Sequence, residues 1–241
     1  IARCSCGVIQ ARPARLQISY EPPHTRAISV SPDRCDAVLG AGGGSSLDVA
    51  KVVALAAANA GCSVQQLVGL NKARRGPLPL FAAPTTAGTG SEASLVSIIS
   101  DPSSHEKQLI ADPRLVPLAA ALDPALTESL PPQITAATGM DALTHAVEAY
   151  IGRWGTPETD QYARTAVQLI LRMLPRAYRD GGDREARLAM ALAAHYAGLA
   201  FTRAMVGYVH AIAHQLGARY GIAHGLANAV ALPHVLEVLL S

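Results

Sequence analysis

The pattern of hydrophobic and polar positions changes near residue 125 and divides the chain into two parts. Before that point, short apolar runs end in glycines or polar residues, which is typical of strands followed by turns. After it, apolar residues recur at the spacing of amphipathic helices. We therefore predict an α/β domain over residues 1–125 and an all-helical domain over residues 126–241.

The pattern of residues 1–125 predicts several strands and one alanine-rich helix. That helix is expected over Leu47–Asn59, because a glycine turn precedes an apolar run without strand alternation. The opening residues 1–32 show no clear period and predict irregular structure. The expected strands are residues 36–40, 78–83, 95–99, 108–111 and 118–122.

The second part predicts helices throughout. In each segment apolar residues return every three or four positions, so that one face of the helix can be buried. The expected helices are Ile134–Tyr150, Asp160–Tyr178, Glu185–Thr202, Val206–Tyr220 and Leu226–Leu240.

Composition and charge exclude several classes of protein. The chain has 241 residues, half of them hydrophobic, and can bury a sizeable core. Its formal net charge is only +2 and its basic residues are scattered, so neither nucleic acid nor an anionic membrane is an expected partner. No apolar segment is long enough to cross a bilayer and no leader pattern opens the chain, which predicts a cytoplasmic protein.

The cysteines Cys4, Cys6, Cys35 and Cys62 all lie in the first quarter of the chain. Their spacing fits neither a zinc knuckle nor a secreted disulfide framework. We therefore expect reduced, mostly unpaired thiols.

A glycine turn stands between the first strand and the helix, at Gly42, Gly43, Gly44 and Ser45. Without a Cβ the backbone can approach a ligand closely, and the amides of the helix start can then bind phosphate. A packing role is an equal alternative, because the turn matches neither the G-x-G-x-x-G fingerprint nor a P-loop. Lys51, further along the helix, is expected to be a solvated charge.

A second polar loop spans Pro84–Glu92 and is dense in hydroxyls and glycines. Its hydroxyls and amides can bind phosphate, ribose or a carboxamide, whereas a simple turn with a cap from Thr89 or Ser91 is the alternative. Both loops follow strands of the same half. Because nucleotides bind at the carboxyl ends of parallel strands, the pair favours a nucleotide site.

The helical half holds six of the eight histidines. Asp141 and His145 are four residues apart, as are His210 and His214, so each pair projects from one helix face. Together with His224 they make a nitrogen and oxygen set suited to Fe, Zn or Co. Each histidine alone is more often a core residue, and the spacing does not say which are ligands.

The residue after His210 argues against a metalloprotease of the H-E-x-x-H type. Enzymes with the H-E-x-x-H motif need a glutamate there, and this chain has Ala211.

Four motifs in order resemble the iron-containing (group III) alcohol dehydrogenases, over roughly residues 33 to 241. They are Gly42-Gly43-Gly44-Ser45-Ser46-Leu47-Asp48-Val49-Ala50-Lys51, Pro84-Thr85-Thr86-Ala87-Gly88-Thr89-Gly90-Ser91-Glu92, Thr138-Gly139-Met140-Asp141-Ala142-Leu143-Thr144-His145-Ala146, and Val209-His210 through His224-Gly225-Leu226-Ala227-Asn228. Such an ordered set is far more specific than any single motif.

The resemblance implies a Rossmann-like nucleotide domain with a parallel sheet, followed by a helical metal domain, as in dehydroquinate synthase-like enzymes, with the active site between them. It implies Asp141, His145, His210 and His224 as metal ligands and His214 as the catalytic or proton-relay histidine. The implied dinucleotide contacts are Gly42, Gly43, Gly44, Ser45, Asp48, Thr85, Thr86, Thr89 and Ser91, with Lys107 at a less distinctive match.

The implied activity is hydride transfer between a small alcohol, or its aldehyde or ketone, and NAD or NADP. Fe²⁺ is the first expectation for the metal and Zn²⁺ the alternative, and a homodimer is kept as a hypothesis. A related glycerol dehydrogenase or maleylacetate reductase stays open as an alternative, as does an inactive metal-binding or assembly module.

Three departures from the family pattern stand out. Ser46 and Ala223 replace prolines, which is a mild change. Family members also begin with a further strand-turn-helix unit and end with more helices, so the resemblance is to a core segment of the enzyme.

Overall fold

The computed structural model describes residues 7–9, 36–101 and 107–240, and its Cα positions fall into two compact units. One unit comprises Ile1–Pro84 and Ser94–Ala121, and the other comprises Thr85–Ala93 and Leu122–Ser241. The threonine-rich loop therefore groups with the helical unit, although it precedes residue 125. Cys4, Cys6 and Cys35 lie outside the described residues, and Cys62 is a free thiol.

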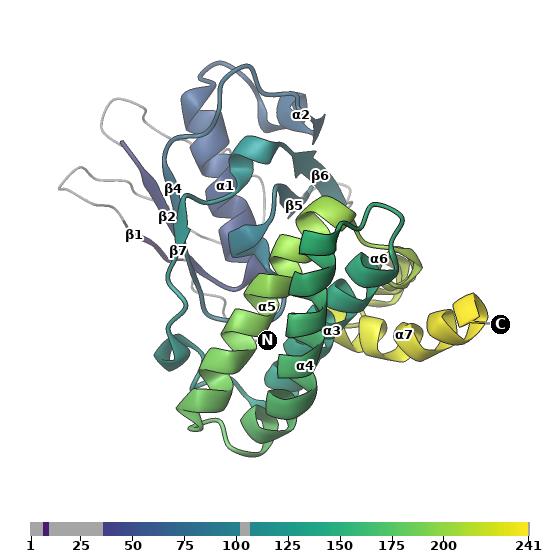
Figure 1. The fold of residues 1–241 in the computed structure, drawn as a ribbon. Coiled ribbons are helices and arrows are strands. Elements are labelled where there is room, and N and C mark those ends of the chain that lie inside the picture. The colour runs from purple at the N-terminus through teal and green to yellow at the C-terminus, as the bar shows by residue number, and fades with distance from the viewer. Residues whose placement is uncertain (1–6, 10–35, 102–106, 241) are drawn as a thin grey trace. The chain divides into compact units, whose positions relative to one another are not determined.

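The first unit contains a four-stranded sheet in the order β1-β2-β4-β7 (Figure 1). Strands β2 (Val38–Gly42), β4 (Leu80–Pro84) and β7 (Ala119–Ala120) run parallel. Strand β1 (Gly7–Ile9) pairs antiparallel with β2, so the prediction of irregular structure for residues 1–32 is wrong at these three residues. The pairing of Gly42 with Pro84 sets the glycine turn beside the end of the strand that leads into the threonine-rich loop.

A second sheet has the order β3-β6-β5. Strand β6 (Lys107–Ala111) pairs in parallel with β3 (Gly69–Leu70) and antiparallel with β5 (Val96–Ser100). A short helix, α2 (Val64–Leu67), and a 3₁₀ turn, η3 (Pro113–Leu115), adjoin it. The strand predicted over residues 118–122 is reduced to the two residues of β7.

Helix α1 (Gly44–Ala58) packs on the strands of both sheets. One of its faces buries Val53 against Val38 and Leu80, and another buries Val52 and Leu55 with Ile110. A helix covered on two sides has no polar stripe to reveal its orientation, which is why alanines and valines occur all round it.

The expectation of a solvated Lys51 is wrong, because this side chain is only 1% exposed. Its Nζ donates hydrogen bonds to the carbonyl oxygen of Ser94 at 2.8 Å, to Ser94 Oγ at 2.9 Å and to the carbonyl oxygen of Val96 at 2.8 Å. The ammonium group thus ties α1 to the start of β5.

Replacing Lys51 with methionine should lower the free energy of unfolding by about 2 kcal/mol, because buried acceptors would lose their donor. Denaturant unfolding measures the change. The exposed Lys72 provides a matched control, and Lys72→Met should leave stability nearly unchanged. Equal stabilities of the two variants would contradict the structural role of Lys51.

The second unit is helical, as predicted. After two 3₁₀ turns, η2 (Ser91–Ala93) and η4 (Pro124–Leu126), it contains α3 (Pro132–Ile151), α4 (Pro157–Arg179), α5 (Arg184–Ala204), α6 (Tyr208–Tyr220) and α7 (His224–Leu240). Each predicted helix is present and its observed bounds differ by a few residues. The predicted fold class, a Rossmann-like α/β part followed by a helical part, is confirmed.

Helices α3, α4 and α5 pack side by side around one core (Figure 1). Their shared core is made mostly of alanines, among them Ala142, Ala146, Ala163 and Ala197. Since alanine lets helix backbones approach, the polar side chains of α3 that face away from this core are held on a rigid support. Within the described residues, no helix has both the length and the apolar character that a membrane crossing needs.

Candidate metal centre

Helices α3, α6 and α7 bring three polar side chains to one point of the helical unit. Asp141 from α3, His210 from α6 and His224 at the start of α7 each offer one ligand atom, and these atoms lie within 4.8 Å of one another. Asp141 Oδ1 is 3.6 Å from His210 Nε2 and 3.4 Å from His224 Nε2. Asp141 and His210 are buried, and His224 is partly exposed.

His145 lies beside this group without being part of it. Its Nδ1 is 3.9 Å from Asp141 Oδ1, and its ring stacks between Phe201 and His210, with centroid distances of 4.3 Å to each. His145 Nδ1 is buried and has no hydrogen-bond partner among the described residues.

Another predicted residue, His214, also borders the group. Its ring stacks on His224 at 5.1 Å and meets the ring of His210 edge-on at 6.1 Å. His214 is half-buried, so it lies between the buried ligand atoms and the surface.

Electrostatics favour a cation at this point. Burial alone would raise the pKa of Asp141, but the imidazoles of His145, His210 and His224 outweigh burial and lower it. Burial, together with the neighbouring imidazoles, lowers the pKa of His145 to about 3, so this ring is neutral at neutral pH. A neutral imidazole and an ionised carboxylate are the protonation states that bind metal ions.

The donor set fits a divalent ion with borderline preferences. Ionised Asp141 faces ring nitrogens at distances longer than direct hydrogen bonds, and the buried nitrogen of His145 lacks a partner beside them. Buried polar atoms without partners are rare unless a ligand or ion completes them. Imidazole and carboxylate ligands together suit Fe, Zn or Co better than Ca or Mg.

Two family models match the chain in succession. The model described as "Iron-containing alcohol dehydrogenase" matches residues 25–124, and "Fe-containing alcohol dehydrogenase family, C-terminal" matches residues 135–241. The chain belongs to the iron-containing alcohol dehydrogenase family. The resemblance drawn from the four sequence motifs is confirmed.

Curated relatives in this family share close to half of their aligned residues with the chain. Alcohol dehydrogenase 4 of Schizosaccharomyces pombe is 47% identical over 206 residues, which are 86% of this chain and 49% of that protein. The NAD-dependent methanol dehydrogenase of Bacillus methanolicus is 44% identical over 84% of this chain and 53% of its own length. The chain thus spans about half the length of the curated relatives it matches.

Solved structures of the family have the same fold. A 1,3-propanediol oxidoreductase structure aligns with a TM-score of 0.82 and 43% identity, over 86% of this chain and 54% of the other. The sulfoacetaldehyde reductase of Bifidobacterium kashiwanohense, solved in complex with NAD⁺, aligns with a TM-score of 0.79 and 36% identity, over 86% and 55% of the two chains.

The glycine turn predicted to contact a dinucleotide connects β2 to α1. Gly42 has a φ of 143°, and a Cβ there would lie 2.6 Å from Ser46, so this position requires glycine for the fold itself. Gly43, the N-cap of α1, has φ −72° and ψ −179°, which any residue adopts. Gly44 opens the helix and Ser45 is exposed. Their contacts with a dinucleotide stay predictions.

Asp48 and Lys107 differ in their surroundings. Asp48 Oδ2 accepts a hydrogen bond at 3.0 Å from the backbone N–H of Ile98, so this carboxylate also ties α1 to β5. Lys107 is exposed at the first residue of β6. Their roles at a cofactor remain predictions.

The threonine-rich loop combines half-buried and buried hydroxyls. Thr89 Oγ1 accepts a hydrogen bond from the N–H of Ser91 at 3.3 Å, and Ser91 is buried at the start of η2. Thr85, Thr86 and Thr89 are half-buried. The capping alternative therefore holds for Thr89, while contacts of the four hydroxyls with a dinucleotide stay predictions.

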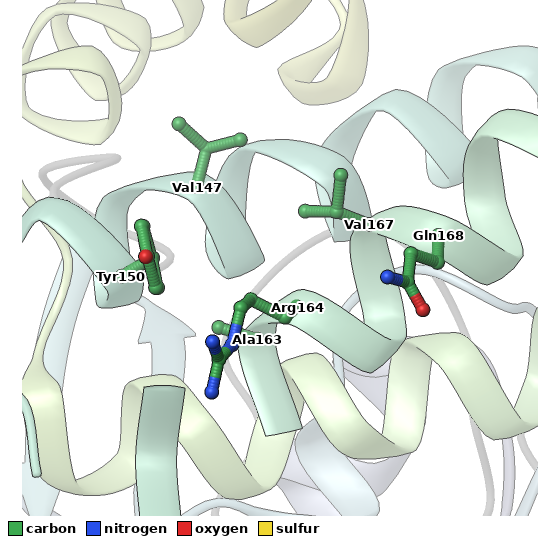
Figure 2. A pocket seen from close by; sticks show the side chains of 6 residues that line it. All are labelled: Val147, Tyr150, Ala163, Arg164, Val167 and Gln168. Atoms are coloured by element: carbon green, nitrogen blue, oxygen red, sulfur yellow. The ribbon is translucent and has the colours of Figure 1, made fainter. Parts of the chain in front are cut away.

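The helical unit also has a groove of about 320 Å³ (Figure 2). It is lined by side chains of α3 and α4: Val147, Tyr150, Ala163, Arg164, Val167 and Gln168. None of the predicted site residues lines it.

Sequence reasoning missed two residues that complete the centre. Asn228 Nδ2 donates to Asp141 Oδ1 at 2.7 Å and lies 3.4 Å from His210 Nε2 and 3.3 Å from His224 Nε2. Glu148 contacts His210 on the other side of its ring. Helix spacing could have found both, because Asn228 follows His224 by four residues and Glu148 follows Asp141 by seven.

Proposed function

We propose that this chain carries the catalytic core of a metal-dependent alcohol dehydrogenase, which transfers a hydride between a small alcohol and NAD or NADP. The reverse reaction reduces the corresponding aldehyde or ketone. One observation carries this proposal: Asp141, His210 and His224 converge in the helical unit of a chain that belongs to the iron-containing family.

The proposed ligands are Asp141, His145, His210 and His224, with Fe²⁺ as the first candidate and Zn²⁺ as the second. A divalent cation at this point would supply a Lewis acid that acidifies the alcohol hydroxyl. Asp141 would contribute the negative charge, and the ring nitrogens of the histidines would contribute lone pairs. The stack of Phe201, His145 and His210 fixes the rings, so that the nitrogens are positioned before an ion binds.

His214 is the proposed proton relay. It borders the ligand group through His210 and His224 and is half-buried, so a proton can reach solvent from its ring. An imidazole exchanges protons near neutral pH, which suits removal of the hydroxyl proton during alcohol oxidation.

The dinucleotide is proposed to bind the glycine turn and the threonine-rich loop. The N-terminus of α1 is the positive end of the helix dipole, which favours a pyrophosphate. Half-buried hydroxyls of Thr85, Thr86 and Thr89 add donors. A nicotinamide ring would accept the hydride.

The variant Gly43→Val tests this cofactor site. Because the backbone at Gly43 is extended, valine can be accommodated by the fold, yet its branched side chain would obstruct an approaching phosphate. We expect NAD(P) affinity to fall roughly 10-fold or more, equivalent to about 1.4 kcal/mol, with unchanged metal content. Calorimetric titration measures the NAD(P) affinity. An affinity equal to that of the parent would show that the cofactor binds elsewhere.

A screen of alcohols with NAD and NADP, in the metal-free and metal-loaded chain, tests the proposed activity. We expect turnover only with metal, and a chain extended to the length of its relatives should be run beside it. Metal binding without turnover in both chains would instead favour a metal-binding or assembly module.

The expected partners are small alcohols or aldehydes, and the names of two relatives illustrate the range: methanol and 1,3-propanediol. A cytoplasmic location and a homodimer are also part of the proposal. Sedimentation measurements on the purified chain test the homodimer, and a single monomeric species would contradict it.

A further inference from the structure

A glutamate outside the predicted ligand set joins α3 to α6 beside the ligand group. Glu148 is 3% exposed and follows His145 by three residues on α3. Its two carboxylate oxygens bind different partners on α6. Burying a charged carboxylate is costly unless hydrogen bonds compensate the loss of water. Both oxygens of Glu148 have such partners.

The first oxygen caps α6. The N-cap residue, Gly207, has no side chain to accept the free amides of the first helical turn. Glu148 Oε1 accepts a hydrogen bond from the N–H of Val209 at 2.6 Å in its place. The positive end of the helix dipole adds a favourable interaction with the ionised carboxylate.

The second oxygen fixes the protonation of a ligand. Glu148 Oε2 is 2.6 Å from His210 Nδ1. A carboxylate that accepts a backbone N–H on one oxygen is placed to accept the Nδ1 hydrogen of His210 on the other, and an imidazole with its hydrogen on Nδ1 keeps its lone pair on Nε2.

That lone pair is on the nitrogen that faces the ligand group. His210 Nε2 lies 3.6 Å from Asp141 Oδ1, on the side of the ring away from Glu148. Ligand histidines commonly bind through one nitrogen while a carboxylate orients the other.

We propose that Glu148 is a positioning residue of the metal centre, which holds His210 in the Nδ1–H tautomer so that Nε2 is available to a cation. The proposal rests on the proposed function for the identity of the centre as a metal site. Glu148 acts through His210 and does not itself belong to the ligand group.

The variant Glu148→Gln keeps one side-chain oxygen and replaces the other with an NH₂ group. If the amide oxygen accepts from Val209, the amide NH₂ faces His210 Nδ1 and can only donate to it, which forces the hydrogen onto Nε2. The variant should therefore populate the Nε2–H tautomer and bind metal about 10- to 100-fold more weakly. A role limited to capping would leave both properties unchanged.

The tautomer is measured without metal by ¹H–¹⁵N NMR of the histidine rings at a pH where His210 is neutral, with the signal assigned by its loss in His210→Asn. Metal affinity is measured separately by competition with a chelator, using Zn²⁺ as the probe. Thr156→Ala is the matched control, because it removes the N-terminal cap of α4 without touching the centre.

We expect the Nδ1–H tautomer in the parent and in Thr156→Ala, and its loss in Glu148→Gln. An Nε2–H tautomer in the parent overturns the proposal. This measurement needs only the parent protein, so it tests the proposal even if Glu148→Gln fails to fold. A folded Glu148→Gln variant with the parental tautomer and affinity also overturns it. If the parent does not bind Zn²⁺, the proposed function is wrong. The tautomer spectrum is recorded without metal, so it tests the role of Glu148 separately from that result.

Discussion

Replacing His210 with alanine should weaken metal binding by more than about 100-fold. Loss of a residue that only hydrogen-bonds to a ligand usually lowers metal affinity by less than this. The substitution removes the nitrogen nearest to Asp141 on α6 and also leaves Glu148 without its histidine partner. Chelator competition, normalised to folded protein, measures the loss.

The exposed His234 on α7 provides the control for this variant. His234→Ala should retain the parental affinity, because this residue is not one of the proposed ligands. If His210→Ala held metal as tightly as His234→Ala, the assignment of His210 as a ligand would be wrong.

Replacing His214 with glutamine should lower turnover by roughly 10²-fold or more while metal and cofactor still bind, since a positioned acid or base contributes that much. The ring of His214 stacks on His224 but is absent from the ligand group, so its loss removes no proposed ligand. The deficit should vary with pH, because a relay contributes most where both protonation states are populated.

Metal and rate must be measured on the same sample of His214→Gln. A loss of stability without a kinetic defect per metal-loaded site would show that His214 only packs against His224. Loss of metal together with activity would indicate that His214 is a metal ligand. One of the other histidines would then not belong to the ligands.

Much of the helical unit could be predicted from sequence, because periodic apolar residues mark long helices clearly. The spacing of Asp141 and His145 on one helix, and of His210 and His214 on another, also indicated the surfaces that carry ligands. Spacing could not select the ligands, because only packing of α3, α6 and α7 decides which side chains converge. That choice came from the resemblance to a family.

Other features depend on contacts between distant segments. Lys51 looked like a surface charge because nothing near it in sequence reveals that α1 packs on two sheets and that its ammonium reaches Ser94. Glu148 likewise looks like an ordinary helix residue until α6 supplies Val209 and His210 as partners. The strand β1 lies in a segment whose sequence has no strand period, and it is fixed by pairing with β2.

X-ray absorption at the metal edge tests the central claim most directly, with the parent chain loaded anaerobically with Fe²⁺ or with Zn²⁺. We expect about one ion per chain, bound by imidazole nitrogens and a carboxylate oxygen at roughly 2.0–2.2 Å. A first shell of oxygens without the scattering of imidazole rings, or no stoichiometric ion at all, would contradict the metal centre formed by Asp141, His210 and His224.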